Sequence, residues 1–219
     1  MSRHPRTWLA AALVVAALAV GGTTGCTSAG DAGHGSMDPS AGPTMDPAMG
    51  SMAHAGAPAG AEEGVDAGFA YDMSVHHAQA VEMAELVAGR VTDPEVAVLA
   101  RDLALTQQYQ IGEMRGWLDG WGLPPTTTRA AMTWMSMSGP MPGLATRDEL
   151  ERLRTAAPGE VDRQFLELMV RHHRGGLAMT EYARDHASAP FVRQFAASIA
   201  DSQVAEIDTM TEILQRLPA

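Results

Sequence analysis

The sequence contains a single cysteine, Cys26, and no lysine, so that all 15 of its basic residues are arginine. One cysteine excludes a disulfide within the chain, and the fold must therefore be stabilised by a packed core. The 26 acidic residues outnumber the basic ones and give a formal net charge of −11. An acidic surface argues against nucleic acid as a partner and is compatible with the binding of cations.

The motifs of several enzyme classes are also missing. The chain has no glycine-rich phosphate-binding loop, no Ser–His–Asp arrangement that its spacing supports, and no nucleophilic cysteine in the folded part. No segment shows a convincing strand pattern. These absences favour an all-helical binding protein over an enzyme, although they leave enzymatic activity undecided.

The first 25 residues have the pattern of a lipoprotein signal peptide. Two arginines precede an apolar run over residues 8–20, which is too short to span a membrane as a mature helix. Cys26 follows Gly25 shortly after this run, as in a bacterial lipobox. We therefore expect lipidation of Cys26 and a location outside the cytoplasm, anchored to the cell membrane. The alternative is ordinary signal cleavage nearby, which would leave a free thiol.

Residues 26–64 are rich in glycine, alanine, serine and proline and show no period, which predicts a flexible tether between the anchor and the folded part. The tether carries several donors for soft metals, namely His34, Met37, Met45, Met49, Met52 and His54. Four more methionines lie between the two halves of the folded part: Met132, Met135, Met137 and Met141. Thioether groups select Cu(I) and imidazole also binds Cu(II), so both segments favour copper. The alternative for the second group is packing against the core.

The folded part, residues 65–219, contains an internal repeat. The segment Phe69–Leu118 aligns without a gap on Phe165–Leu214, at a constant offset of 96 residues. Besides apolar residues, the two copies share a His-His pair, a glutamine and several methionines. The identical pairs include Met73/Met169, His76/His172, His77/His173, Met83/Met179, Gln107/Gln203 and Met114/Met210. Each copy of such a repeat is one structural unit that the other must complete.

Apolar residues at helical spacing predict a long helix at the start of each copy, over residues 66–87 and about 160–186. Thr92 and Ser188, each two residues before a proline, are the predicted N-caps of the following helices. A capping box at Thr146 predicts a short helix between the copies. The repeats, about 65–122 and 160–217, thus form two tandem helical hairpins joined by a long crossover. The expected fold is an all-α four-helix bundle.

The first helix of each copy places methionine and histidine on one stripe. Residues at positions i, i+3 and i+10 face the same side of a helix. They are Met73, His76 and Met83 in the first copy, and Met169, His172 and Met179 in the second. The adjacent His77 and His173 point about 100° away, at 3.6 residues per turn. These two are predicted to join the same site from its edge or to pack towards the neighbouring helix.

The second helix of each copy offers polar residues on one face, Gln107 and Gln110 against Gln203 and Glu206. If the copies pack about a pseudo-twofold axis, these side chains converge with the histidines in the core. A buried polar group without a partner costs roughly 1–3 kcal/mol, so the histidines need partners, and a metal ion is the favoured one. The methionines are expected to be core residues first and ligands second. The candidate metal ligands are His76, His77, His172, His173, Glu206, Gln203, Gln107, Met73, Met169, Met83 and Met179.

A di-iron site is not indicated. Such bundles use a Glu-x-x-His motif on two helices, whereas Met73 and Met169 stand three residues before the first histidine of each pair. Only Glu206 places a carboxylate on the second-helix face, because its counterpart is Gln110. The donors therefore favour a copper ion, with another transition metal as the alternative.

The pattern Phe-x-x-x-Met-x-x-His-His, with a methionine six residues after the second histidine, precedes Gln-x-x-Glu-Ile-x-x-Met. This combination resembles the bacterial domain-of-unknown-function family 305, over about residues 65–217. The two His pairs match those of the family, and so do Gln203 and Glu206, whereas Gln110 stands where the second motif has glutamate. The resemblance implies an extracytoplasmic protein with a ferritin-like helical bundle fold and an association with copper handling.

The sequence as a whole predicts an extracytoplasmic, metal-binding lipoprotein, with copper as the expected ion and metal buffering or resistance as its role. One alternative is a structural or partner-binding bundle whose His pairs are satisfied internally. A metal-dependent redox enzyme is the third. The expected partners are a metal ion and, through the lipid anchor, the membrane. No nucleic acid is expected, and a homo-oligomer is left open.

Overall fold

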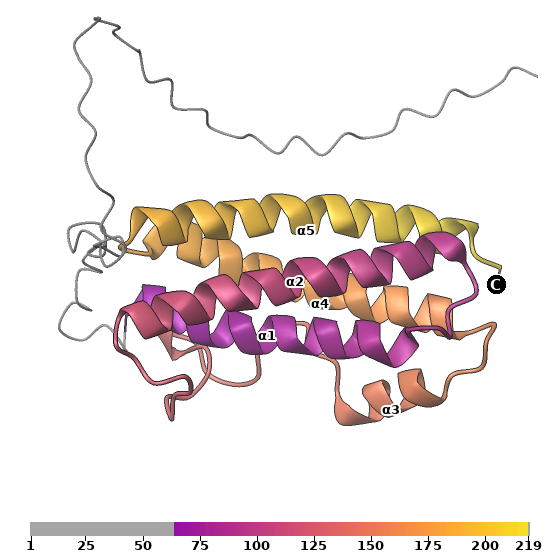
Figure 1. The fold of residues 1–219 in the computed structure, drawn as a ribbon, viewed down its shortest axis with the longest axis horizontal. Coiled ribbons are helices and arrows are strands. Elements are labelled where there is room, and N and C mark those ends of the chain that lie inside the picture. The colour runs from indigo at the N-terminus through magenta and orange to yellow at the C-terminus, as the bar shows by residue number, and fades with distance from the viewer. Residues whose placement is uncertain (1–63, 219) are drawn as a thin grey trace, which may run out of the picture. The chain divides into compact units, whose positions relative to one another are not determined.

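Four long helices in two antiparallel hairpins form the body of the fold. The computed structural model describes residues 64–218, so the expected signal peptide, Cys26 and tether residues 26–63 lie outside the described residues. Helices α1 (Val65–Val87) and α2 (Pro94–Gly120) make the first hairpin, and α4 (Val161–His186) and α5 (Pro190–Arg216) make the second (Figure 1). No strand occurs between residues 64 and 218. The all-α four-helix fold predicted from the repeat is confirmed.

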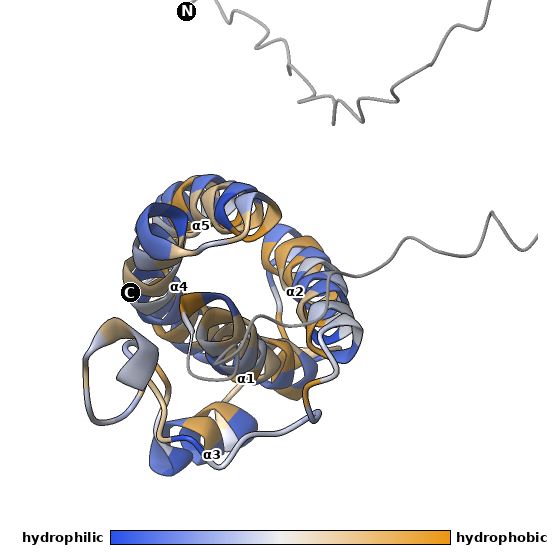
Figure 2. Cartoon of the chain, turned by 90° about the vertical axis from the view of Figure 1, so that its left-hand side faces the viewer, coloured by the Kyte–Doolittle hydropathy of each residue, from blue (hydrophilic) through white to orange (hydrophobic). Residues whose placement is uncertain are grey.

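The two hairpins meet through their first helices. Within the hairpins α1 packs against α2 and α4 packs against α5, and between the hairpins α1 packs against α4. The end-on view of Figure 2 shows the four helices around a common axis, with α1 adjacent to both α2 and α4. Within residues 64–218, no helix combines the length and the apolar character that a membrane span requires.

The crossover between the hairpins contains a short 3₁₀ helix, η3 (Thr133–Met135), and the helix α3 (Arg147–Thr155). The Thr146 hydroxyl accepts a hydrogen bond from the backbone N–H of Glu149, and the Glu149 carboxylate accepts one from the Thr146 N–H at 2.7 Å. This is the predicted capping box. Both η3 and α3 pack against α1, so the crossover covers one side of the bundle (Figure 1).

The predicted N-caps Thr92 and Ser188 are wrong. The structure places the N-caps one residue later, at Asp93 for α2 and at Ala189 for α5. The Thr92 hydroxyl instead donates to the carboxylate of Asp162 on α4, at 2.8 Å. The first turn of α2 is capped locally, because the Asp93 carboxylate accepts from the N–H groups of Glu95 and Val96. The residues just before the helix are held from the opposite hairpin by Asp162.

The apolar core is divided into two clusters along the bundle axis. One cluster lies at the α3 end and includes Met83 and Met169, and the other lies at the η3 end and includes Met73 and Met179. Between them lies a band of buried polar side chains from all four helices, which we call the histidine layer. Its members are His76, His77, His172, His173, Gln107, Gln110 and Gln203. Because buried polar groups are costly unless they are paired, this layer is the candidate functional site.

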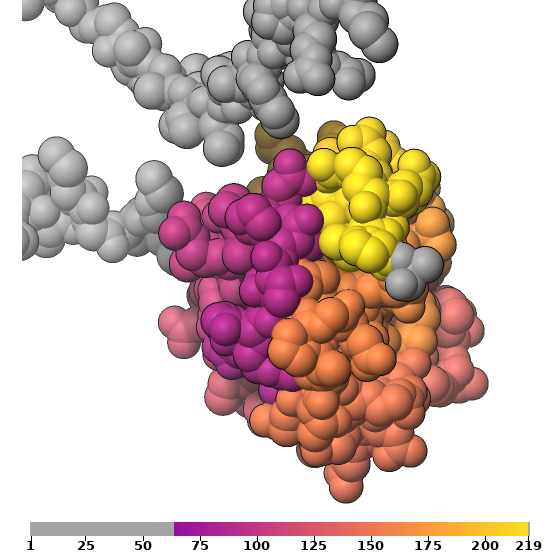
Figure 3. Space-filling view, turned by 90° about the vertical axis from the view of Figure 1, so that its right-hand side faces the viewer, coloured from indigo at the N-terminus to yellow at the C-terminus, as the bar shows by residue number. Residues whose placement is uncertain are grey.

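The α3 end of the bundle is closed by packed residues. In Figure 3, the start of α4 and the residues before it (orange) fill the space between the first hairpin (magenta) and α5 (yellow). The Arg90 guanidinium donates to the carbonyl oxygens of Leu153 and Ala156, at 2.9 and 2.8 Å. Arg163 donates to the carbonyl oxygens of Leu217 and Pro218. These contacts hold the connections of this end in place and shield the core behind them.

Candidate metal centre

His76 and His172 face each other across the interface of α1 and α4. The centroids of their rings lie 3.8 Å apart with an interplanar angle of 35°, and neither side chain is exposed to solvent. Nε2 of His76 lies 3.0 Å from the carbonyl oxygen of Pro142, and Nε2 of His172 lies 2.9 Å from the carbonyl oxygen of His76. Because a carbonyl oxygen only accepts, both Nε2 atoms carry the proton and donate. Each Nδ1 is then left with a free lone pair.

His77 and His173 occupy equivalent positions of the repeat but have different partners. Nε2 of His173 donates to the carboxylate of Glu206 on α5, at 2.9 Å. Gln110 of α2 stands beside His77 at the position equivalent to Glu206. Neither ring nitrogen of His77 has a partner at good hydrogen-bond geometry. The amide of Gln110 nevertheless raises the pKa of His77, against the larger lowering by burial. The layer is therefore asymmetric, with one histidine anchored by a carboxylate and its counterpart unanchored.

Unpaired polar atoms are concentrated in the histidine layer. The buried side-chain atoms of residues 64–218 without a hydrogen bond are Nδ1 of His76, His77, His172 and His173, Nε2 of His77, Oε1 of Gln107, both polar atoms of Gln203, and Nε of Arg129. Each such group costs roughly 1–3 kcal/mol, so a cluster of them needs a further partner. In three of the four histidines one nitrogen is held by an oxygen and the other is free. Histidines that bind metal ions have this arrangement.

Burial keeps the imidazoles of His76, His77 and His172 neutral. Burial, more than any other cause, lowers the pKa of His76 to about 4 and the pKa of His77 to about 3, and it lowers the pKa of His172 well below its usual value. A positive charge on His76, when that ring is protonated, further lowers the pKa of both His77 and His172. The hydrogen bond to Pro142 acts in the opposite direction and raises the pKa of His76. Neutral imidazole is the form that binds a metal ion, so at neutral pH these three rings present uncharged nitrogen donors.

The four predicted methionine ligands are fully buried and flank the layer from both sides. Met73 and Met83 lie on the same face of α1, but at 1.5 Å per residue they are about 15 Å apart along the helix axis, so they cannot bind one ion together. Met73 and Met169 lie about one turn before the histidine pair of their helix. Met83 and Met179 lie about two turns beyond it. Of the four, Met73 and Met169 are the better placed to join the histidines.

The predicted residues of the second helices also reach the layer. Gln107 and Gln203 are buried, and Gly176 makes room for the latter, because a Cβ atom at Gly176 would lie 2.8 Å from Oε1 of Gln203. Glu206 is partly exposed and hydrogen-bonds the layer through His173. Within residues 64–218, no group of three or more His, Cys, Asp or Glu side chains is arranged to hold a metal ion. The structure brings together one stacked pair of rings, His76 with His172, and places the other two histidines beside it.

Sequence reasoning missed the part of the crossover that touches the layer. We call residues 141–145 the strap, because they run along α1 and α4 beside the stacked histidines. Gln79 of α1 donates to the Ala145 carbonyl oxygen at 2.9 Å and accepts from the Ala145 N–H at 2.7 Å. Gly175, at the position of α4 equivalent to Gln79, lies so close to Pro142 that a side chain there would collide with the strap. This difference between the two copies, Gln in one and Gly in the other, was the signal in the sequence.

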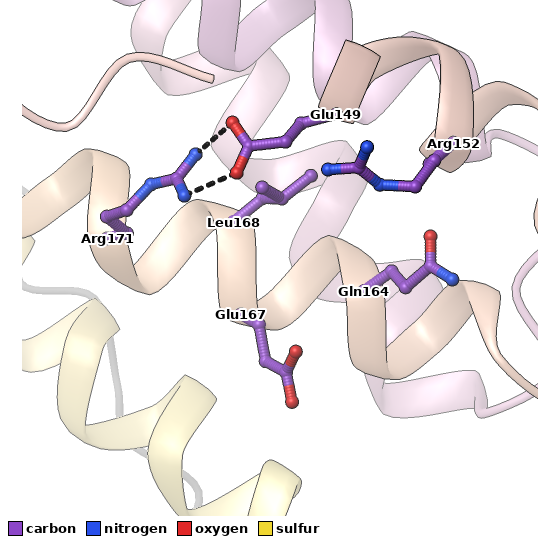
Figure 4. Close-up of a pocket in the computed structure, with 6 residues that line it drawn as sticks. All are labelled: Glu149, Arg152, Gln164, Glu167, Leu168 and Arg171. Carbon is purple, nitrogen blue, oxygen red and sulfur yellow. Dashed lines mark hydrogen bonds and ion pairs between the residues drawn. The ribbon is translucent and has the colours of Figure 1, made fainter. Parts of the chain in front are cut away.

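A surface groove of about 320 Å³ lies between α3 and α4 (Figure 4). Glu149 and Arg171 pair across it through two contacts of 2.6 Å each, and the hydrogen bonds from Arg171 lower the pKa of Glu149 to about 2. None of the predicted ligands lines this groove. Because Glu149 of α3 and Arg171 of α4 are paired with each other, we assign the groove the structural role of tying α3 to α4.

Comparison with known proteins places this arrangement in a family. Residues 66–214 match the family model described as a domain of unknown function, DUF305. A DUF305 protein from Streptomyces coelicolor that is described as secreted has a crystal structure with a TM-score of 0.68 and 42% sequence identity; the match covers 71% of this chain and 94% of that one. A DUF305 fragment from Deinococcus radiodurans has a TM-score of 0.61 and 35% identity, covering 70% of this chain and 97% of the fragment.

A third similar structure is that of CopM in its Cu(I)-bound form, with a TM-score of 0.54 and 28% identity over 70% of this chain and 98% of CopM. None of the curated protein sequences matches the chain. The family match covers both His pairs and the whole histidine layer. The chain therefore belongs to the DUF305 family, as the duplicated His-His pattern predicts.

Proposed function

We propose that this protein binds copper ions and that the histidine layer is the binding site. The observation that carries the proposal is the state of His76 and His172: in each ring Nε2 donates to a backbone carbonyl oxygen, while Nδ1 is buried, unprotonated and unpaired. A metal ion bound to these Nδ1 atoms would supply the partner that they lack. Hydrogen bonds of this kind to the opposite nitrogen fix the orientation of the ring and raise its basicity towards a metal.

The donor set supports copper in preference to harder ions. Neutral imidazoles are supplied by the stacked pair, and thioethers are supplied by Met73 and Met169, one turn away on the same helices. Imidazole suits both oxidation states of copper, and thioether selects Cu(I). CopM, similar to this chain in fold and sequence, is seen in Cu(I)-, Cu(II)- and Ag-bound forms, which supports the same class of cargo for this chain.

The proposed role is metal buffering or resistance outside the cytoplasm. The similar Streptomyces coelicolor protein is described as secreted, and the first 25 residues of this chain have the pattern of an export signal. Anchoring to the membrane through lipidated Cys26 is part of the proposal. All four imidazoles are sealed from solvent. A sealed site retains an ion and exchanges it slowly, which suits storage more than rapid catalysis.

A structural bundle without a cargo is the second candidate, and one observation favours it. The chain itself supplies a hydrogen-bond partner to three of the four histidines, through Pro142, His76 and Glu206. In that case the layer would specify how the two hairpins register against each other, as buried polar groups do in some bundles. Metal binding distinguishes the two candidates.

The test is competition for Cu(I) between the full chain and a chromophoric chelator. We expect the double variant His76→Ala/His172→Ala to lose the tightest site while its helical circular dichroism is retained. The matched control is His186→Ala, an exposed histidine at the end of α4, which should leave the affinity unchanged. Unchanged Cu(I) and Cu(II) affinity in the double variant would leave the structural role as the better account.

A further inference from the structure

The histidine layer can be reached only if part of the protein moves. His76 and His172 have no exposed surface, and the α3 end of the bundle is closed (Figure 3). A cavity of about 380 Å³, however, opens between α1, α2 and the crossover. Its wall includes Val75 and Ala78, the neighbours of the His76–His77 pair in the sequence, and Met141, the first residue of the strap. The cavity thus ends where the strap crosses the helix that carries His76.

Two polar anchors hold the strap on α1. At one end Pro142 accepts the hydrogen bond from Nε2 of His76, and at the other Ala145 is paired with Gln79 through both of its backbone groups. On the side that faces α4, the strap itself carries a glycine, Gly143. Its φ is +78°, and a Cβ atom on it would lie 2.5 Å from the carbonyl oxygen of Arg171 on α4. Gly143 thus meets α4 through backbone alone, whereas Ala145 packs into the core cluster at the α3 end. The polar anchors of the strap all lie on α1.

Met141, whose thioether is a soft metal donor, directly precedes Pro142 in the chain. Its side chain lines the cavity, is partly exposed, and precedes the residue whose carbonyl oxygen holds His76. The only carboxylate in the cavity wall, Asp72, accepts hydrogen bonds from the Met132 N–H and from the Trp134 indole, both at 2.7 Å. A thioether is thus the donor at the strap that remains free for a soft monovalent ion.

We propose that Cu(I) reaches the histidine layer through this cavity, that Met141 binds the ion first, and that the strap lifts to pass the ion to His76. The proposal rests on the proposed function, since it assigns a path to that site. Lifting breaks the Pro142–His76 and Ala145–Gln79 hydrogen bonds, which frees the His76 ring to turn its unprotonated nitrogen towards the ion.

The test measures the rate of uptake of Ag(I), a redox-inert stand-in for Cu(I), by the full chain in stopped flow. The phase that disappears in His76→Ala/His172→Ala reports the buried layer and separates it from binding by other methionines and histidines. Met141→Leu keeps the volume of the side chain but removes the thioether, and we expect this phase to slow about tenfold with equilibrium affinity nearly unchanged. Gln79→Ala removes two hydrogen bonds of the closed strap and should accelerate the phase roughly tenfold.

The matched control is Gln108→Ala, an exposed glutamine of α2, which should leave the phase unchanged. An uptake rate in Met141→Leu equal to that of the unmodified chain would return Met141 to a packing role and overturn the proposal. An unchanged rate in Gln79→Ala, with the melting temperature unaltered, would show that the strap does not control access. If the unmodified chain shows no phase that depends on His76 and His172, the proposed function itself fails, which is a distinct result.

Discussion

Asp66 and Asp162 occupy the same position in the two repeats, and each holds the start of the second helix in the opposite hairpin. Asp162 of α4 accepts from the N–H groups of Thr92 and Asp93, just before α2, at 3.0–3.1 Å, and from the Thr92 hydroxyl. Asp66 of α1 accepts from the N–H groups of Ser188 and Ala189, just before α5, at 2.9 and 2.8 Å. The pseudo-twofold relation of the hairpins is thus maintained by reciprocal charge-assisted hydrogen bonds.

This relationship predicts unequal losses of stability. Asp162 is buried and accepts from three groups, so Asp162→Ala should lower the free energy of unfolding by about 2–3 kcal/mol. Asp66 is only half-buried and accepts from two, so Asp66→Ala should cost about 1 kcal/mol. Urea unfolding followed by circular dichroism measures both. Asp208→Ala, at an exposed position in the middle of α5, should have no measurable effect. Equal losses of stability in the two variants would contradict the larger contribution assigned to Asp162.

The metal-free protein should lose stability in mild acid. The unfolded chain takes up protons on its histidines below pH 6.5, whereas folded His76 and His77 resist protonation until pH values of about 4 and about 3. The unfolded state therefore binds more protons, and the free energy of unfolding falls as the pH drops from about 6.5 towards 4, by up to ~1.4 kcal/mol per pH unit for each histidine. Urea unfolding at a series of pH values gives the slope. A flat profile between pH 6.5 and 5 would mean that these rings are solvated in the folded state.

The two non-stacked histidines should respond in opposite ways to the same substitution. His77 has no well-made hydrogen bond, so His77→Leu removes an unpaired buried group and should leave the metal-free protein as stable or about 1 kcal/mol more stable. His173→Leu strands the Glu206 carboxylate and should destabilise it by about 1–3 kcal/mol. Thermal melts of both variants in the presence of a chelator make the comparison. A loss of stability in His77→Leu equal to that in His173→Leu would mean that His77 has a partner in the folded protein.

The methionines should divide into ligands and core residues. Met73→Leu/Met169→Leu removes the thioethers one turn from the His pairs and should weaken Cu(I) binding while Cu(II) binding is retained. Met83→Leu/Met179→Leu serves as the matched control, because these side chains are equally buried but lie farther from the layer. Both double variants should fold with little loss of stability, since Leu and Met are close in volume. A Cu(I) affinity in both variants equal to that of the unmodified chain would return these methionines to the core and leave the histidines, the glutamines and Glu206 as the candidate ligands.

The tether should add binding capacity without adding stability. Deletion of residues 27–64 removes two histidines and four methionines but few large apolar groups. We expect a lower copper stoichiometry in titrations and an unchanged melting temperature of the metal-free protein. An equal copper count in the two chains would reduce the tether to a spacer.

The features that the sequence by itself determined are those that depend on local spacing. Helical hairpins follow from apolar residues at a period near 3.6 and from the two Pro-containing helix starts. The capping box of Thr146 and Glu149 is a contact between residues three apart, and it occurs as predicted. The duplicated His-His pair signalled membership of the family and the position of the polar layer, because each copy places the pair at the same height of its helix.

Only the tertiary structure decided which hydrogen bonds the side chains of the histidine layer make. The N-cap lies at Asp93, which accepts from the N–H groups of Glu95 and Val96, whereas the Thr92 hydroxyl donates to Asp162, 70 residues away in the chain. The stacking of His76 on His172, and the proton that each Nε2 donates to a carbonyl oxygen, depend on how α1 packs against α4 and on where the crossover returns. Such contacts join residues distant in sequence, and no local pattern encodes them. The chain therefore specifies its helices and their donors locally, and the packing of the two hairpins decides which lone pairs remain free.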